Sequence, residues 1–159
     1  MNGRRLAIGV LLVSMELAAC SGVRIRSPIA TADGPPSTYV HSTADSRSRR
    51  VLEVRDGLAK PALFKALSDY LSESFTVDVS DPNSGFLMTP WQASLLRDGV
   101  PDLRYRTRVI VRFLGDEWRQ VSVKSEANWQ RGEEWEFGFD TKLLDTVTAE
   151  VRNRVGKKP

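Results

Sequence analysis

Residues 103–114, LRYRTRVIVRFL, and residues 117–127, EWRQVSVKSEA, are the stretch that decides the fold. Apolar and polar side chains alternate along both segments, and arginine occupies every second position from Arg104 to Arg108. Successive side chains of a strand point to opposite faces of a sheet, whereas a helix repeats every 3.6 residues. The alternation therefore predicts two long strands, each with one buried and one exposed face.

The loop between these segments sets their register. A two-residue loop at 115–116 would mix buried and exposed faces and set like charges opposite each other. A three-residue loop at 115–117 keeps the faces separate and pairs Val111 with Val121. We therefore predict a hairpin with the three-residue loop.

The arginine-bearing face of this hairpin is expected to point away from the core. Arginines beside large apolar side chains are typical of protein–protein interfaces. An ordinary solvated sheet face, balanced by acids such as Glu126, is the alternative. The candidate partner-binding residues are Trp91, Arg104, Arg106, Arg108, Ile110, Arg112, Leu114 and Trp118.

Two segments have the apolar spacing of amphipathic helices. The first is predicted over residues 61–74, with Leu63, Leu67, Tyr70 and Leu71 on one face. The second follows Asp140 or Thr141, either of which can cap it. Its apolar stripe is Leu143, Leu144, Val147, Val151 and Val155.

The remaining segments predict shorter strands and loops. We expect a strand over residues 51–55, a hairpin of 75–80 with 86–89, a loop over 92–102, and a loop or short strand over 129–139. The order β-α-β-β-β-β-α predicts an α+β two-layer sandwich. In it, an antiparallel sheet of four or five strands carries both helices on one face.

The first 19 residues read as a secretory signal peptide. Arg4 and Arg5 precede an apolar run over residues 6–13, and Glu16 interrupts the segment before it could span a bilayer. A twin-arginine signal is the alternative, but its flanking consensus is missing. Export is therefore expected.

The sequence Leu17-Ala18-Ala19-Cys20 resembles the lipobox of bacterial lipoproteins. The resemblance implies cleavage between Ala19 and Cys20 and lipidation of Cys20, which would anchor the chain stably through two or more acyl chains. Ser21, by resemblance to lipoproteins of enteric bacteria, favours the outer membrane with the domain facing the periplasm. An ordinary signal peptide with an incidental cysteine is the alternative.

A composition change separates the expected tether from the domain. Residues 20–49 are rich in Ser, Thr, Pro and Gly, including Gly34-Pro35-Pro36-Ser37, and lack apolar periodicity, which is typical of a linker. Residues 50–159 are the expected single domain. Arg47, Arg49 and Arg50 form a small basic cluster at this boundary, suited to a solvated linker end or to anionic headgroups.

Composition limits the chemistry available. The 159 residues include one cysteine and one histidine, with 23 Lys and Arg against 20 Asp and Glu. The single Cys20 excludes an internal disulfide, and His41 falls in the expected linker. Neither a glycine-rich phosphate loop nor a calcium-loop spacing of carboxylates occurs. We expect a non-enzymatic protein without metal, cofactor or nucleic acid; a hydrolase with a deep polar pocket is the alternative.

The motifs PALFKAL (61–67), FTVDVSD (75–81) and GFLMTPW (85–91), followed by RYRTR (104–108), resemble the C-terminal helix-grip domains of BamC-type lipoproteins. The resemblance covers about residues 51–155 and implies a helix-grip fold and a role in outer-membrane assembly. This chain has one such domain instead of two and lacks a long N-terminal binding segment. GVRIR (22–26) is also similar to the start of lipopolysaccharide-transport lipoproteins of the LptE type.

These observations predict an accessory lipoprotein that binds an envelope protein through the arginine-bearing face. The alternative is a module that binds lipid or lipopolysaccharide through the same arginines.

Overall fold

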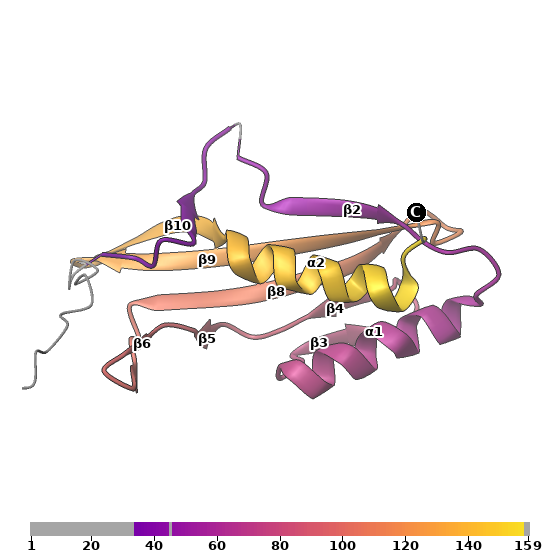
Figure 1. Ribbon diagram of the computed structural model, residues 1–159, viewed down its shortest axis with the longest axis horizontal. Coiled ribbons are helices and arrows are strands. Elements are labelled where there is room, and N and C mark those ends of the chain that lie inside the picture. Colours follow the sequence, from indigo (N-terminus) through magenta and orange to yellow (C-terminus); the bar gives the residue numbers. More distant parts are fainter. Residues whose placement is uncertain (1–33, 45, 158–159) are drawn as a thin grey trace, which may run out of the picture. The chain divides into compact units, whose positions relative to one another are not determined.

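A long antiparallel hairpin forms the centre of the sheet. In the computed structural model, which describes residues 34–44 and 46–157, β8 (Tyr105–Leu114) and β9 (Gln120–Arg131) pair over ten residues (Figure 1). The pairing runs from Tyr105 opposite Trp129 to Leu114 opposite Gln120. The two long strands predicted from alternation are confirmed.

The register of this hairpin differs by two residues from the predicted one. Val111 lies opposite Val123 instead of Val121, because the connecting loop spans residues 115–119. An even shift leaves each strand side chain on its predicted face, since side chains alternate with a period of two. In the longer loop, Gly115 and Trp118 both adopt left-handed backbone angles, with φ of 67° and 51°.

The sheet is larger than predicted, with eight strands among the described residues instead of four or five. Its main order is β1-β10-β9-β8-β4-β3, while β2 also pairs with β9 and β5 with β8. Residues predicted as a loop or short strand extend β9 and form β10. The bounds are β1 Tyr39–His41, β2 Arg49–Glu53, β3 Val79–Asp81, β4 Phe86–Met88, β5 Gln92–Ala93 and β10 Glu134–Asp140.

Part of the predicted linker belongs to the domain. β1 pairs with β10, and the Tyr39 ring meets the Tyr105 ring edge-on, with centroids 6.0 Å apart. The Thr38 hydroxyl donates a hydrogen bond of 2.7 Å to Asp140. The folded part thus includes residues 34–44 and 46–49, which the prediction gave to the linker, and His41 lies exposed on an edge strand.

The segment predicted as a loop over 92–102 contains β5 and a small separate hairpin. β6 (Leu96–Arg97) and β7 (Val100–Pro101) pair around Asp98 and Gly99, whose φ angles are 51° and 81°. Two-residue hairpin turns favour Asp-Gly because both positions need positive φ. The dipeptide was the signal that the loop prediction overlooked.

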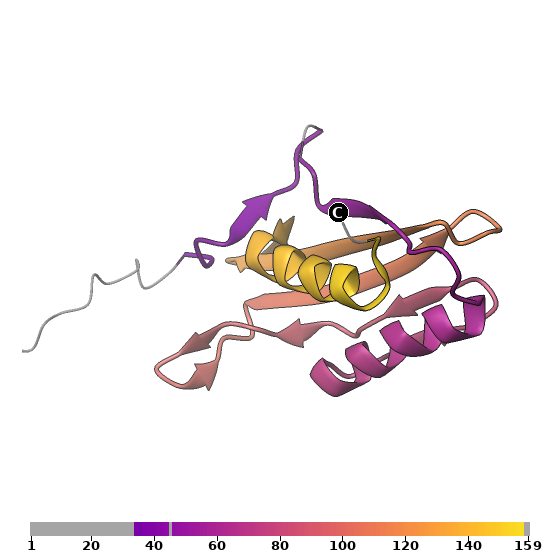
Figure 2. The same cartoon turned by 45° about the vertical axis from the view of Figure 1, so that its right-hand side comes forward.

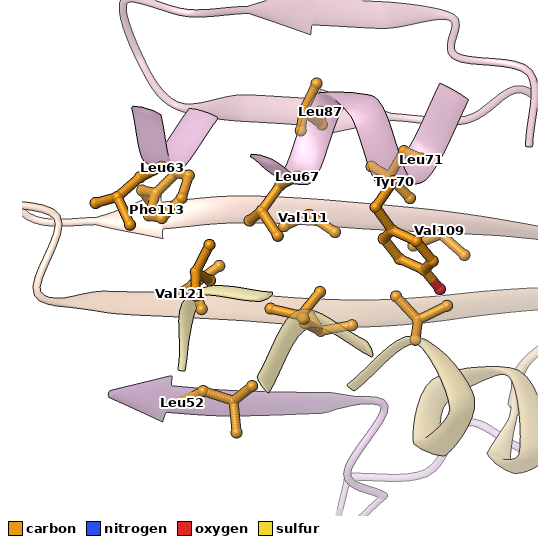
Figure 3. Close-up of a cluster of buried hydrophobic side chains, with 14 of the residues drawn as sticks. Leu52, Leu63, Leu67, Tyr70, Leu71, Leu87, Val109, Val111, Phe113 and Val121 are labelled. Atoms are coloured by element: carbon orange, nitrogen blue, oxygen red, sulfur yellow. The ribbon is translucent and has the colours of Figure 1, made fainter. Parts of the chain in front are cut away.

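The two helices cover one face of the sheet, as predicted (Figures 1 and 2). α1 (Lys60–Ser74) and α2 (Thr141–Val155) bury their predicted apolar stripes, apart from half-buried Leu143, against alternate residues of the strands. Figure 3 shows helix and strand side chains meeting in this core. The core includes Leu52, Leu63, Leu67, Tyr70, Leu71, Leu87, Val109, Val111, Phe113, Val121, Val123, Leu144, Val147, Val151 and Val155.

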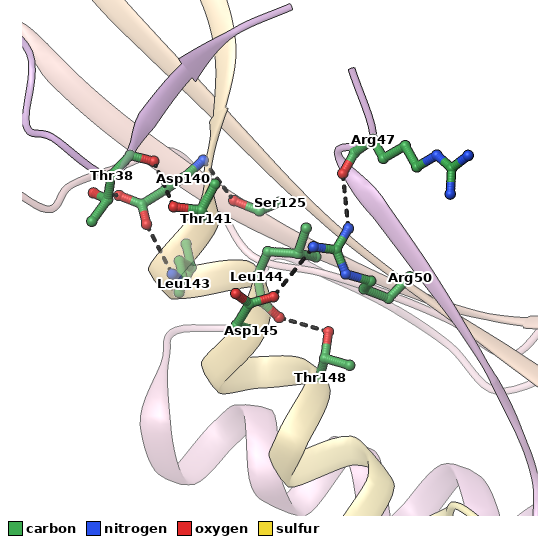
Figure 4. Close-up of polar contacts among 10 residues, drawn as sticks. All are labelled: Thr38, Arg47, Arg50, Ser125, Asp140, Thr141, Leu143, Leu144, Asp145 and Thr148. Carbon is green, nitrogen blue, oxygen red and sulfur yellow. Dashed lines mark hydrogen bonds and ion pairs between the residues drawn. The ribbon is translucent and has the colours of Figure 1, made fainter. Parts of the chain in front are cut away.

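A polar network fixes the start of α2 (Figure 4). Asp140 is the N-cap, one of the two predicted choices, and its Oδ1 accepts a 2.8 Å hydrogen bond from the Leu143 N–H. Its Oδ2 accepts 2.8 Å from the Tyr105 hydroxyl. Burial, followed by this hydrogen bond, raises the pKa of Tyr105 above its usual value. With Thr38, the network joins β1, β8 and α2.

Trp118 belongs to the core, so its predicted place beside the arginines is wrong. Its side chain is 6% exposed and stacks on Phe113, with centroids 4.6 Å apart and planes 7° from parallel. The absence of a side chain at Gly85 makes space for this ring, because a Cβ there would lie 2.7 Å from Trp118 Cζ2. The prediction continued strand alternation through residues that form a loop, where the left-handed Trp118 turns its ring inward.

We predict that Trp118→Ala lowers the free energy of unfolding by about 3–5 kcal/mol, because it leaves a cavity in the core. Phe137→Ala is the control, since that side chain is 63% exposed, and it should change stability by about 0.5 kcal/mol. Urea denaturation followed by circular dichroism measures both. Equal effects of the two substitutions would contradict the placement of Trp118.

Candidate binding face of the sheet

The sheet face away from the helices, called the open face below, carries the residues that alternate with the core. The register places side chains of β8, β9 and β10 side by side on it. Trp91 joins them from the segment before β5 through its contacts with two arginines. The set that we follow is Trp91, Arg106, Arg108, Ile110, Arg112, Leu114, Lys124, Glu126, Asn128, Trp135 and Phe137.

Arg106 lies between two tryptophans at the centre of this set. The guanidinium carbon is 4.0 Å from the ring centroid of Trp135 and 5.2 Å from that of Trp91. Its Nε is buried and has no hydrogen-bond partner in the part of the chain that the structure describes. Cation–π contacts contribute about 0.5–2 kcal/mol, more when water is excluded. The two indole rings therefore supply the main stabilising surroundings of this cation.

A charged cluster adjoins the stack. Arg108 lies 4.6 Å from the Trp91 centroid and pairs with Glu126, Nε to Oε2, at 2.6 Å. Lys124 Nζ is 2.5 Å from the other carboxylate oxygen. Burial raises the pKa of Glu126, but the hydrogen bonds from Lys124 and Arg108 outweigh it and leave the pKa below its usual value. Glu126 is thus held ionised.

A hollow of about 260 Å³ opens beside these residues. Phe137 forms part of its wall and is 63% exposed, so an aromatic surface stands free in solvent. Aromatic rings, paired charges and an amide suit recognition by contact. The lining residues are Ser42, Ser48, Trp91, Arg108, Lys124, Glu126, Asn128, Phe137 and Gly138.

The structure brings together only some of the predicted binding residues. Trp91, Arg106 and Arg108 meet as described, while Ile110, Arg112 and Leu114 continue along the same face, with Arg112 exposed and the other two half-buried. Two predicted members lie elsewhere, Trp118 in the core and Arg104 beside the β6–β7 hairpin. The centre of the open face is therefore narrower than the predicted arginine stripe.

Arg104 leaves the open face because it precedes the paired part of β8. Its guanidinium lies 5.2 Å from the Trp129 ring centroid. It also makes a 3.0 Å ion pair with Asp102, which lies in the same loop. Strand alternation does not extend to a residue whose side chain is held by its own loop.

Trp135 and Phe137 are the residues that sequence reasoning missed. Both follow a turn at Gly132, and their spacing of two is the period of a strand. That signal was present, but the many aromatic residues of this stretch led to the interpretation of a loop or short strand packed by aromatic side chains. Pairing with β9, Phe137 opposite Asn128, places them on the open face.

Other chemistry in the described residues is limited. No three His, Cys, Asp or Glu side chains among residues 34–44 and 46–157 lie close enough together to hold a metal ion. Neither helix in the described part of the chain has the length and hydropathy needed to cross a bilayer. Residues 1–33 lie outside the description, including the predicted signal peptide, Ala19 and Cys20.

Comparison with models of known protein families and with curated proteins finds no match for this chain.

We predict that Glu126 makes stability depend on pH. An unfolded glutamate titrates near pH 4.3, and the folded pKa is lower, so the ionised form stabilises the fold above about pH 4.3. That contribution is lost as pH falls through the folded pKa. Wild type should therefore exceed Glu126→Gln in free energy of unfolding at pH 7, with the gap narrowing below about pH 4.3.

Urea denaturation across this pH range measures the gap. Glu133→Gln, in the exposed β9–β10 turn, is the matched control. A gap that is independent of pH would contradict the role of the Arg108–Glu126–Lys124 cluster.

Proposed function

We propose that the chain is a non-enzymatic lipoprotein of the bacterial envelope whose open face binds another envelope protein. The observation that carries this proposal is the Trp91–Arg106–Trp135 stack beside exposed Phe137. Tryptophan and arginine are enriched among residues that dominate binding energy at protein interfaces. The partner we infer offers an apolar or acidic group to this centre.

The geometry of the stack supports a protein partner. Aromatic rings give a large contact area, and the Arg108–Glu126 pair beside them can exchange hydrogen bonds with a partner of either charge. Hot spots sit at the centre of an interface surrounded by residues that exclude water. Arg106 lies between the two indole rings, with Phe137 and Arg112 further out on the same face.

The cellular location of the protein is the second part of the proposal. The signal-like residues 1–19 and the lipobox-like sequence ending at Cys20 support anchoring in the outer membrane with the domain in the periplasm. The motifs shared with BamC-type lipoproteins support an accessory role in outer-membrane assembly or maintenance.

A second candidate function is binding of lipopolysaccharide or another anionic lipid. A basic hollow of about 530 Å³ favours it, lined by Ser46, Arg47, Ser48, Arg49, Val51 and Lys124. Lys124 also belongs to the open face, so the hollow and the open face are continuous. Phosphate groups would bind to the basic side chains of this shared surface. Such binding would be electrostatic and therefore weakened by salt.

We predict specific photocrosslinking from the open face. With benzoylphenylalanine in place of Phe137 in the membrane-anchored protein, one envelope protein should be captured. The same group at Lys65 on α1, whose side chain is 74% exposed on the helix side, should not capture it. Arg106→Ala should reduce capture at least fivefold, because it removes the cation between the two indoles.

The outcomes separate the two functions. Identical products from Phe137 and Lys65 would contradict a protein-binding open face. Binding to purified lipopolysaccharide that vanishes at high salt and in Arg108→Glu, without protein capture, would favour the second function.

We predict that Cys20→Ala abolishes both palmitate labelling and membrane association, because the thiol is the proposed site of acylation. Ser21→Ala is the matched control and should retain both. Membrane fractionation and metabolic labelling measure the result. A wild-type chain without label, or a Cys20→Ala chain that stays on membranes, would contradict the anchor.

A further inference from the structure

The β6–β7 hairpin exposes a group of large apolar side chains that the open face does not use. Leu96 is 64% exposed, Val100 65% and Leu103 76%. They fall within eight consecutive residues, together with exposed Pro101. Single exposed leucines need no explanation, but this small hairpin exposes Leu96 and Val100 on its two faces and Leu103 directly after it, and such a concentration of exposed apolar side chains marks an interaction site.

Three of the four charged residues of this segment are held against one another at its base, while Asp98 is exposed in the turn. Asp102 accepts hydrogen bonds from Arg97 Nε at 2.5 Å and from Arg104 Nε at 3.0 Å. Both guanidiniums also lie over the ring of Trp129, at 5.9 and 5.2 Å from its centroid. The segment 95–104 contains two arginines and two aspartates, so its formal charge is zero.

These contacts, together with two backbone hydrogen bonds, attach the hairpin to the sheet. The Asp102 N–H donates to the Leu95 carbonyl at 2.8 Å, and the Gln130 N–H donates to the Arg104 carbonyl at 2.8 Å. Leu95 packs against the small buried cluster that contains Trp129. The apolar side chains therefore project from a fixed support.

The hairpin lies where the chain from the proposed anchor enters the domain. The Arg97 guanidinium donates a hydrogen bond to the carbonyl oxygen of Gly34, the first described residue. Cys20 precedes Gly34 by 14 residues. A chain of that length spans at most about 50 Å fully extended, and a random coil of that length spans about 20 Å. A lipid on Cys20 would therefore keep Gly34, and with it the hairpin base, within about 20 Å of the bilayer on average.

We propose that the β6–β7 hairpin is a second membrane contact, which inserts Leu96, Val100 and Leu103 into the headgroup boundary of a lipid bilayer. The inference rests on the lipid anchor of the proposed function. Once the anchor holds the chain, the second contact is intramolecular, so a weak apolar insertion is enough. Because the hairpin has no net charge, its insertion is insensitive to salt, unlike binding through the arginines.

The test places the anchor chemically, so that it does not depend on lipidation in the cell. The chain from Cys20 onward, which contains every described residue, is coupled through its only thiol to a maleimide lipid. The vesicles contain phosphatidylethanolamine and phosphatidylglycerol. Benzoylphenylalanine replaces Leu103, and in a matched control it replaces Asp116. Asp116 is exposed in the loop after β8, about 30 Å along the strand from the hairpin.

Irradiation should yield at least tenfold more lipid adduct from position 103 than from position 116, at low and high salt alike. Leu96→Ser with Val100→Ser should reduce the adduct at least fivefold and leave the thermal unfolding curve unchanged, since both residues are exposed. Equal adducts at positions 103 and 116, or adducts from 103 to a second copy of the chain in place of lipid, would overturn the proposal. Failure of lipidation at Cys20 in cells would instead appear only in the palmitate experiment.

Discussion

The ladder between β8 and β9 is the constraint on which the rest of the structure depends. Ten consecutive pairs commit alternate side chains to opposite faces, so Val109 and Val111 face the helices while Arg106 and Arg108 face away. Helices with one apolar stripe each can then bury it only on the valine face. The same alternation that builds the core therefore assembles the arginines on the open face, and neither could change without the other.

A second constraint ties the periphery to this ladder. Asp140 is 8% exposed, and its carboxylate caps α2 while accepting hydrogen bonds from Thr38 and Tyr105. Removing one hydrogen-bond partner of a buried charged group costs more free energy than an average hydrogen bond contributes, because the group stays buried with no water to replace the lost partner. The short strand β1 therefore keeps its place through this network and through Tyr39, which packs on Tyr105 and closely over Gly138.

Periodicity explains which features the sequence could reveal. The faces of β8 and β9 and both helices follow from local spacing, which also limits the cap of α2 to Asp140 or Thr141. The register does not follow from spacing, because two registers that differ by two residues place the same side chains on the same faces and differ only in the length of the loop. Trp118 was misplaced because one backbone angle in that loop turns its ring inward. β1 has three residues and depends on Tyr105 and Asp140, which are distant in sequence. Trp135 and Phe137 show the strand period of two, but over so few residues that the pattern did not distinguish a short strand from a loop.

The stacking of Arg106 has a thermodynamic consequence. A free arginine side chain loses about 2 kcal/mol of rotamer entropy when it is fully immobilised. In this protein the two indole rings restrict the guanidinium during folding, before any ligand arrives. A molecule that docks on this cation would therefore meet a group with little freedom left to lose, and more of the contact energy would appear as affinity.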